Sequence, residues 1–150
     1  MRFKFLAVLA LAALVSACAG TTGGGAGSGS ATPGTQEDLV VNVGDRVFFD
    51  FDKYNLGADA RRTLEKQAAW LKANAGISVT VEGHADERGT REYNIALGER
   101  RANAVKDYLV ALGVSPNRVK TISYGKERPV ALGSNEAAWQ QNRRGVTVVN

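Results

Sequence analysis

This chain of 150 residues contains a single cysteine and a single histidine. Cys18 has no second thiol to pair with, which excludes an intrachain disulfide. His84 alone is a thin basis for a zinc site, so we expect no metal and no cofactor, and we expect His84 to be a structural residue with its hydrogen bonds satisfied. Asp86 and Glu87 are neighbours in one loop and do not supply the two separated acids of a glycosidase. The sequence therefore favours a binding protein over an enzyme.

The chain also lacks a strong charge of either sign. It has 19 basic and 15 acidic side chains, and two of the basic ones, Arg2 and Lys4, lie within the first 17 residues. The remaining arginines are interspersed with acids, and no stacking aromatic residues alternate with them as a nucleic-acid platform requires. We therefore expect no nucleic-acid partner.

The only marked apolar run is residues 5–14, which is too short to span a membrane as a permanent helix. It follows a short basic region and precedes Val15-Ser16-Ala17-Cys18, which looks like a bacterial lipobox. This arrangement predicts a lipoprotein signal peptide at 1–17 and acylation of Cys18 after cleavage. Several acyl chains on Cys18 would hold the protein on a membrane essentially permanently.

The residues after Cys18 predict a location and a tether. Ala19 stands where an Asp would retain such a lipoprotein at the inner membrane, so we expect an outer-membrane protein whose domain faces the periplasm. The segment 18–36 is rich in Gly, Ser and Thr and predicts a flexible linker with a span of roughly 20 to 25 Å. Residues 37–150 have the length of one domain with a single core.

Changes of hydrophobic period outline that domain. Alternation of Val47, Phe49 and Phe51 predicts a first strand, and the stripe of Ala60, Leu64, Ala68 and Leu71 predicts a helix that ends before Gly76. The further predicted elements are a strand at 77–82, a helix at 91–112, a strand at 119–124, a short helix at 136–142 and a strand at 145–149. The result is an α+β fold, β-α-β-α-β-(α)-β, with a mixed sheet and its helices packed on one side.

The helix at 91–112 carries two adjacent arginines with different expected roles. Thr90 is placed to cap this helix and Gly113 to end it. At about 100° per residue, Arg101 lies roughly 50° from the centre of the apolar stripe and Arg100 roughly 150° away. We therefore expect Arg101 at the rim of the buried face and Arg100 in solvent.

Arg101 and Asp86 have opposite charges, and the residues alone leave two interpretations open. The two side chains could form a structural salt bridge with each other. Alternatively they could form a clamp for a zwitterion, in which Asp86 binds an ammonium group and Arg101 binds a carboxylate.

Further candidates surround this pair. Asp52 would either touch ligand or order its loop. Asn94 would bind peptide groups or the start of the helix, and Leu97 would form pocket wall and core. One of Arg143 and Arg144 is expected beside the pocket and the other at a solvated edge, and the sequence does not decide which.

The stretch that holds these residues closely resembles the OmpA-like peptidoglycan-binding domain, and the likeness runs from about residue 47 to 149. The family pattern appears here as Gly83-His84-x-Asp86, followed by the matching residues Asn94, Leu97, Arg101, Ala102, Val105 and Leu109. One position departs, because Gly98 stands where the pattern often has Ser.

The resemblance implies that Asp86 and Arg101 hold diaminopimelate in the stem peptide of peptidoglycan. Lipoproteins with this domain tether the outer membrane to the wall non-covalently. They join the Tol system, which supports envelope integrity and cell division, and they bind the periplasmic protein TolB. The alternative, a module that mainly docks TolB or another periplasmic protein, remains open.

Overall fold

The computed structural model describes residues 30–150, which form a four-stranded sheet in the order β1-β4-β2-β3. The predicted signal peptide, Cys18 and most of the predicted linker lie outside the described residues. The strands are β1 (Arg46–Phe48), β2 (Val79–His84), β3 (Val119–Gly125) and β4 (Arg144–Val149). Strand β4 runs antiparallel to β1 and β2, whereas β2 and β3 are parallel. The sheet is therefore mixed, as predicted.

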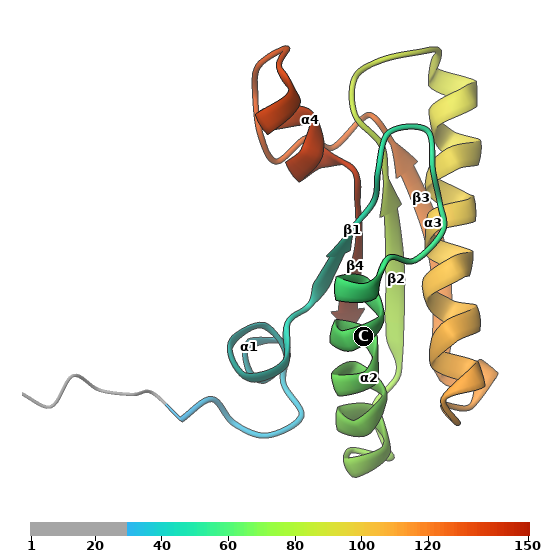
Figure 1. Cartoon of the computed structure of the whole chain (residues 1–150). Helices are drawn as coiled ribbons and strands as arrows, with labels where there is room; N and C mark the ends of the chain where they lie inside the picture. The colour runs from blue at the N-terminus through green and yellow to red at the C-terminus, as the bar shows by residue number, and fades with distance from the viewer. Residues whose placement is uncertain (1–29) are drawn as a thin grey trace, which may run out of the picture.

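Two long helices, α2 (Ala58–Ala73) and α3 (Arg91–Ala111), pack on the same face of the sheet (Figure 1). Thr90 caps α3 by accepting a hydrogen bond from the backbone of Tyr93, and Gly113 ends it with φ +100°, so both predicted helix signals are confirmed. The short helix α4 (Glu136–Asn142) has the predicted bounds and lies beyond the end of the sheet at which β1 and β2 end (Figure 1).

The core lies between the sheet and these two helices. Most of its largest fully buried apolar side chains come from predicted helices and strands: Leu64, Leu71, Val79, Val81, Val105, Leu109 and Val119. Leu39 and Val114 are equally buried but lie outside the predicted elements. The 3-10 helix η2 (Pro116–Arg118) connects α3 to β3.

The predicted first strand is too long at its C-terminal end. Strand β1 ends at Phe48, and Phe51 lies in the following loop with 56% of its surface exposed. Its pairing partner explains the difference. Strand β4 begins at Arg144, which pairs with Phe48, so only one more backbone bond, from Phe49 to Arg143, extends the ladder.

Strand β2 and helix α3 touch at two glycines. A Cβ built on Gly83 would lie 1.7 Å from the carbonyl oxygen of Gly98, and one built on Gly98 would lie 2.3 Å from the Ser123 hydroxyl. Side chains at these positions would force the helix off the sheet. Gly98 thus serves close helix–strand packing and is not among the residues that line the cavities described below.

The packed part of the chain begins before the boundary predicted at residue 37. Ala31 is only 7% exposed, and the Gln36 side chain accepts from the backbone N–H of Val149 and donates to the carbonyl of Thr147. Two unpredicted elements follow, the short helix α1 (Gln36–Asp38) and the π-helix η1 (Leu39–Val43). Within residues 30–150, no helix is both long enough and apolar enough to cross a membrane.

Candidate functional site

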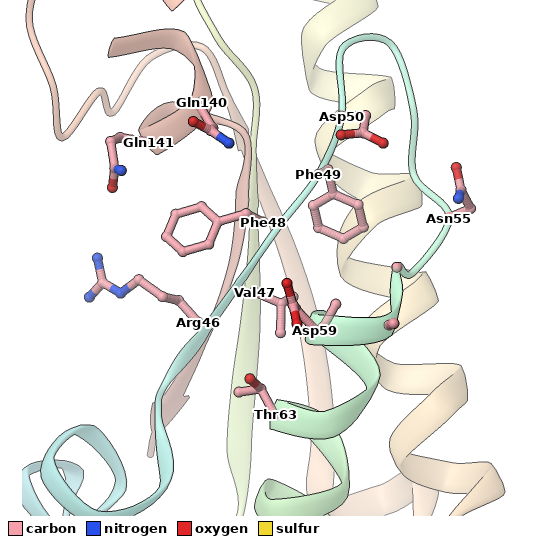
Figure 2. Close-up of a pocket in the computed structure, with 13 residues that line it drawn as sticks. Arg46, Val47, Phe48, Phe49, Asp50, Asn55, Asp59, Thr63, Gln140 and Gln141 are labelled. Atoms are coloured by element: carbon pink, nitrogen blue, oxygen red, sulfur yellow. The ribbon is translucent and has the colours of Figure 1, made fainter. Parts of the chain in front are cut away.

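One cavity lies beside β1 and does not contain the predicted site residues (Figure 2). Its volume is about 500 Å³, and its walls come from β1, the start of α2 and the glutamines of α4. Phe48 and Phe49 point to opposite sides of the strand there (Figure 2). The ion pairs of its lining residues, Arg46–Asp45 and Arg62–Asp59, join residues that are close in sequence. Among the described residues, no buried charges from different elements pair across this cavity, so its chemistry does not mark it as a binding site.

A smaller cavity, about 230 Å³, lies where the loops after β1 and β2 meet the first turns of α3. Its walls are formed by Phe51, Asp52, Asp86, Arg88, Gly89, Tyr93, Asn94, Leu97 and Arg101. The structure thus brings all five predicted ligand residues together. We take this cavity as the candidate site.

Arg101 is not the rim residue that its helical position predicted. It is fully buried, at 0% exposure. Its Nε donates to the carbonyl of Lys53 (2.8 Å), Nη1 to that of His84 (2.8 Å) and Nη2 to that of Asp50 (3.1 Å). The guanidinium therefore ties the loop after β1 to the end of β2. A guanidinium has five N–H donors, so the three carbonyls leave part of its hydrogen-bonding capacity for the cavity.

Burial, together with repulsion from Arg143, lowers the pKa of Arg101 to about 10. The carboxylates of Asp86 and Asp52 oppose this shift. Arg101 therefore keeps its positive charge at neutral pH in a setting of low dielectric, where a bound carboxylate interacts with it more strongly than it would in water.

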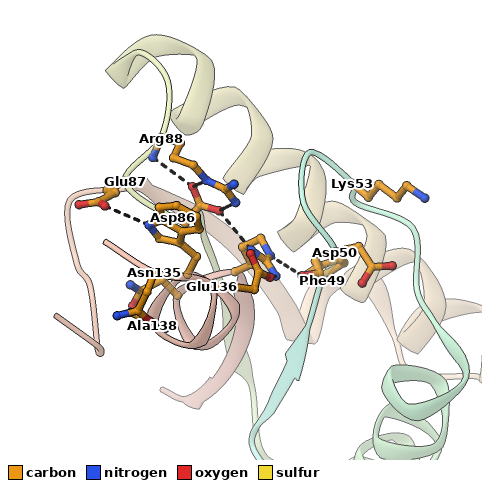
Figure 3. Close-up of polar contacts among 12 residues, drawn as sticks. Phe49, Asp50, Lys53, Asp86, Glu87, Arg88, Asn135, Glu136 and Ala138 are labelled. Carbon is orange, nitrogen blue, oxygen red and sulfur yellow. Dashed lines mark hydrogen bonds and ion pairs between the residues drawn. The ribbon is translucent and has the colours of Figure 1, made fainter. Parts of the chain in front are cut away.

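Asp86 is 4% exposed and is held by two other arginines (Figure 3). Its Oδ1 accepts from the backbone N–H (3.0 Å) and Nε (3.1 Å) of Arg88, and its Oδ2 accepts from Arg88 Nη2 (2.7 Å) and lies 3.4 Å from Arg143 Nη1. Burial would raise the pKa of Asp86, but the bonds and charge of Arg88, helped by Arg143, hold it below its usual range. The salt bridge considered between Asp86 and Arg101 is not formed.

Arg88 lines the cavity but was not predicted as a site residue. Its guanidinium lies over the rings of both Phe51 (3.9 Å to the centroid) and Trp139 (4.0 Å), while Trp139 Nε1 donates to Glu87. The one local signal was its position two residues after Asp86, where an aspartate oxygen commonly accepts the backbone N–H. The aromatic partners are distant in sequence, Phe51 in the loop after β1 and Trp139 in α4, and gave no such signal.

The structure also separates the two C-terminal arginines. Besides its contact with Asp86, Arg143 donates from Nε to the carbonyl of Phe49 and from Nη2 to Glu136 (Figure 3). Arg144 pairs instead with the carbonyls of Asn142 and Arg128. Arg143 is therefore the arginine beside the site.

The other predicted residues have structural roles around the cavity. The Asn94 amide donates to the carbonyls of Arg88 (2.8 Å) and Thr90 (3.0 Å), which confirms the helix-start bonding considered for it. Leu97 is buried and forms cavity wall. Asp52 has φ +57°, a left-handed conformation that Asp tolerates better than most residues, and it shapes the turn of the loop.

His84 lies under the site and is 1% exposed. Its ring stacks on Tyr124, its Nε2 lies 3.4 Å from Glu82 Oε2, and its Nδ1 has no partner among the described residues, so the expectation of a fully satisfied histidine is wrong. Burial, reinforced by the charges of Arg144, Arg128 and Arg46, lowers the pKa of His84 to about 4. Within residues 30–150, no three His, Cys, Asp or Glu side chains gather as metal ligands would.

A mixed sheet with helices on one face and a charged cavity at its strand ends defines a binding domain, and comparison with known families identifies it. The chain belongs to the OmpA family, whose model matches residues 48–143. This family is not enzymatic, which confirms the expectation of a binding protein.

Individual relatives are more specific. The chain is 60% identical over 126 residues to the peptidoglycan-associated lipoprotein of Brucella melitensis, covering 84% of this chain and 75% of that one. It is 42% identical over 161 residues to the protein of that name in Pseudomonas aeruginosa, covering 96% and 95%. The crystal structure of the peptidoglycan-associated lipoprotein from Burkholderia pseudomallei superposes with a TM-score of 0.69 at 44% identity, covering 71% of this chain and 90% of that one. These relatives place the chain among peptidoglycan-associated proteins of the cell envelope.

Proposed function

We propose that the cavity between Asp86 and Arg101 binds the diaminopimelate of a peptidoglycan stem peptide without covalent chemistry. The observation that carries the proposal is that a buried carboxylate and a buried guanidinium line one cavity without pairing with each other. Diaminopimelate ends in an ammonium and a carboxylate on one carbon. Asp86 would bind the former and Arg101 the latter through charge-assisted hydrogen bonds.

The remaining walls suit the rest of such a ligand. Leu97 and the rings of Phe51 and Tyr93 offer apolar surface for its methylene chain. The side-chain oxygen of Asn94 accepts no hydrogen bond from the described residues, so it is available to a peptide N–H. Asp52 at the cavity mouth would add a second negative charge near the ammonium.

The cellular role follows from joining this site to the predicted amino-terminal anchor. An acylated Cys18 in the outer membrane and the following linker would confine the domain near the wall, where a high effective concentration of ligand multiplies a weak affinity. We therefore propose an outer-membrane lipoprotein that tethers the membrane to peptidoglycan as part of the Tol system, supporting envelope integrity and cell division.

A protein partner, TolB, would use the same surface. Two aromatic residues that line the cavity, Phe51 and Tyr93, are exposed, and aromatic residues are enriched at protein interfaces. Because Phe51 and Tyr93 also line the cavity, TolB and peptidoglycan would compete. Competition predicts that a diaminopimelate muropeptide releases bound TolB.

Sedimentation with purified sacculi tests wall binding. The chain from residue 19 onward should co-sediment with diaminopimelate-type sacculi and not with lysine-type sacculi. Asp86→Asn should abolish co-sedimentation, while Asp107→Asn, an exposed acid on α3, should not. Equal sedimentation with both sacculi, or an unaffected Asp86→Asn variant, would favour TolB docking as the main role.

A further inference from the structure

The carboxylate proposed to receive the ligand's ammonium is already occupied by a cation of the same chain. Arg88 engages both oxygens of Asp86 through Nε and Nη2, at 3.1 and 2.7 Å. The shorter of these contacts has the length of a strong charge-assisted bond. A ligand ammonium cannot take both oxygens until Arg88 gives up at least one of them.

Arg88 is also held by two aromatic rings. Its guanidinium carbon lies 3.9 Å from the centroid of the Phe51 ring and 4.0 Å from that of Trp139, and both contacts are within cation–π range. Its side chain nevertheless remains 29% exposed, unlike Asp86 and Arg143. It is therefore the partner of Asp86 that can move without disturbing the core.

The charge around Asp86 determines which ligands could displace Arg88. Three guanidiniums, those of Arg88, Arg101 and Arg143, lie around it. Glu136 is engaged by Arg143, and Glu87 accepts from Trp139. A ligand that brought only an ammonium would leave the displaced Arg88 without its anionic partner and close to two other cations, Arg101 and Arg143. A ligand that also brought a carboxylate would supply a new partner for the released guanidinium or for Arg101.

We propose that Arg88 is a specificity-determining residue, an internal cation that fills the Asp86 subsite and yields to a ligand that carries an ammonium and a carboxylate together. This inference rests on the proposed function of the cavity. It assigns the discrimination between a zwitterionic end and a simple amine to Arg88, in addition to Arg101.

Two tripeptides provide matched probes. L-Ala-γ-D-Glu-meso-diaminopimelate has the distal carboxylate, and L-Ala-γ-D-Glu-L-Lys has the amine without it. For the chain from residue 19 onward, the first should bind and the second should bind at least about tenfold more weakly, a difference typical of one charge-assisted contact. In Arg88→Gln, the lysine peptide should bind about tenfold more tightly than in wild type, so that the ratio of the two affinities falls.

Control variants separate this role from a general effect of charge. Arg91→Gln removes an exposed arginine that pairs with Glu127 outside the cavity, and it should leave the ratio unchanged. Arg88→Lys keeps the charge but loses the bidentate fork and should give an intermediate ratio. Circular dichroism spectra and thermal melts matching those of wild type would show that the Arg88 variants fold.

Trp139 gives a second readout. Displacement of Arg88 from its ring should change Trp139 fluorescence when the diaminopimelate peptide binds, and Trp139→Phe, which retains Trp70, should show no change. An unchanged affinity ratio in folded Arg88→Gln, or a silent Trp139 at saturation, would overturn the inference while leaving wall binding intact. If wild type bound neither peptide, the proposed function itself would fail and the inference with it.

Discussion

Asp86 and Arg101 line the same cavity but have separate sets of partners. Arg101 donates to the carbonyls of Asp50, Lys53 and His84, whereas Asp86 accepts from Arg88 and Arg143. A direct salt bridge between them would neutralise both charges and leave nothing for a zwitterion. Their separation is therefore what allows the cavity to present an anion and a cation at once.

The first prediction concerns the stability supplied by Arg101. Arg101→Ala removes the donor from three backbone carbonyls, so it should lower the free energy of unfolding by about 3 to 5 kcal/mol. Urea denaturation measures the loss. Arg100→Ala is the matched control, since Arg100 is exposed, and it should stay within about 0.5 kcal/mol of wild type. Equal stability of the two variants would contradict the role given to Arg101.

A second prediction concerns the contact between α3 and the sheet. Gly98→Ala places a Cβ 2.3 Å from the Ser123 hydroxyl and 2.9 Å from the carbonyl of Gly83, and it should destabilise the domain by about 1 to 3 kcal/mol. Adding Ser123→Ala should recover part of this loss. Thermal melts measure the loss of stability. Gly76→Ala is the control, because a Cβ built on Gly76 meets nothing within 4 Å, and this variant should be nearly as stable as wild type. A neutral Gly98→Ala would show that the helix can retreat at no cost.

A third prediction concerns pH. Because the folded state lowers the pKa of His84 from 6.5 to about 4, unfolded chains bind a proton that folded chains exclude between these values. Stability should therefore be complete above about pH 6.5 and fall by up to about 3 kcal/mol as the pH drops toward 4. The lowered pKa values of Asp38 and Asp86 act below this window.

His84 is the only histidine, so its imidazole resonances can be followed directly by NMR during a pH titration. His84→Gln should flatten the stability profile between pH 4 and 6.5 in urea denaturation. A measured His84 pKa near 6.5 would sink this prediction.

A fourth prediction concerns the start of the domain. A fragment beginning at residue 37 loses both Gln36 bonds to β4, together with the packing of Ala31, and should be about 1 to 3 kcal/mol less stable than one beginning at residue 30. Gln36→Ala in the longer fragment should account for part of the difference. If the fragment from residue 30, the fragment from residue 37 and the Gln36→Ala variant had identical denaturation midpoints, the stable domain would begin at residue 37.

The sequence predicted elements well where the signals are local. The α4 bounds, the Thr90 cap and the Gly113 stop depend on residues within a few positions of each other, and the structure has all three. Alternation failed at Phe51 because a strand needs a partner as well as a pattern, and β4 supplies none beyond Arg143.

Five of the residues that line the candidate site were predicted, but Arg88 and the geometry of the site were not. Helical spacing places Arg101 relative to its own helix, and it contains no information on the loop at 50–53, which folds over the guanidinium from 48 to 51 residues away in sequence. The Arg88 stack depends on two further segments, the loop after β1 and helix α4. Phe51 belonged to the predicted first strand and Trp139 to the predicted short helix, and only the fold shows that both rings lie against one cation.

Calorimetric titration with a diaminopimelate muropeptide and its lysine analogue tests the central claim most directly. The chain from residue 19 onward should bind the first selectively, and Asp86→Asn should weaken that binding at least about tenfold while Asp107→Asn does not. If wild type bound both muropeptides equally, or if folded Asp86→Asn bound as wild type does, the cavity would not be the wall-binding site.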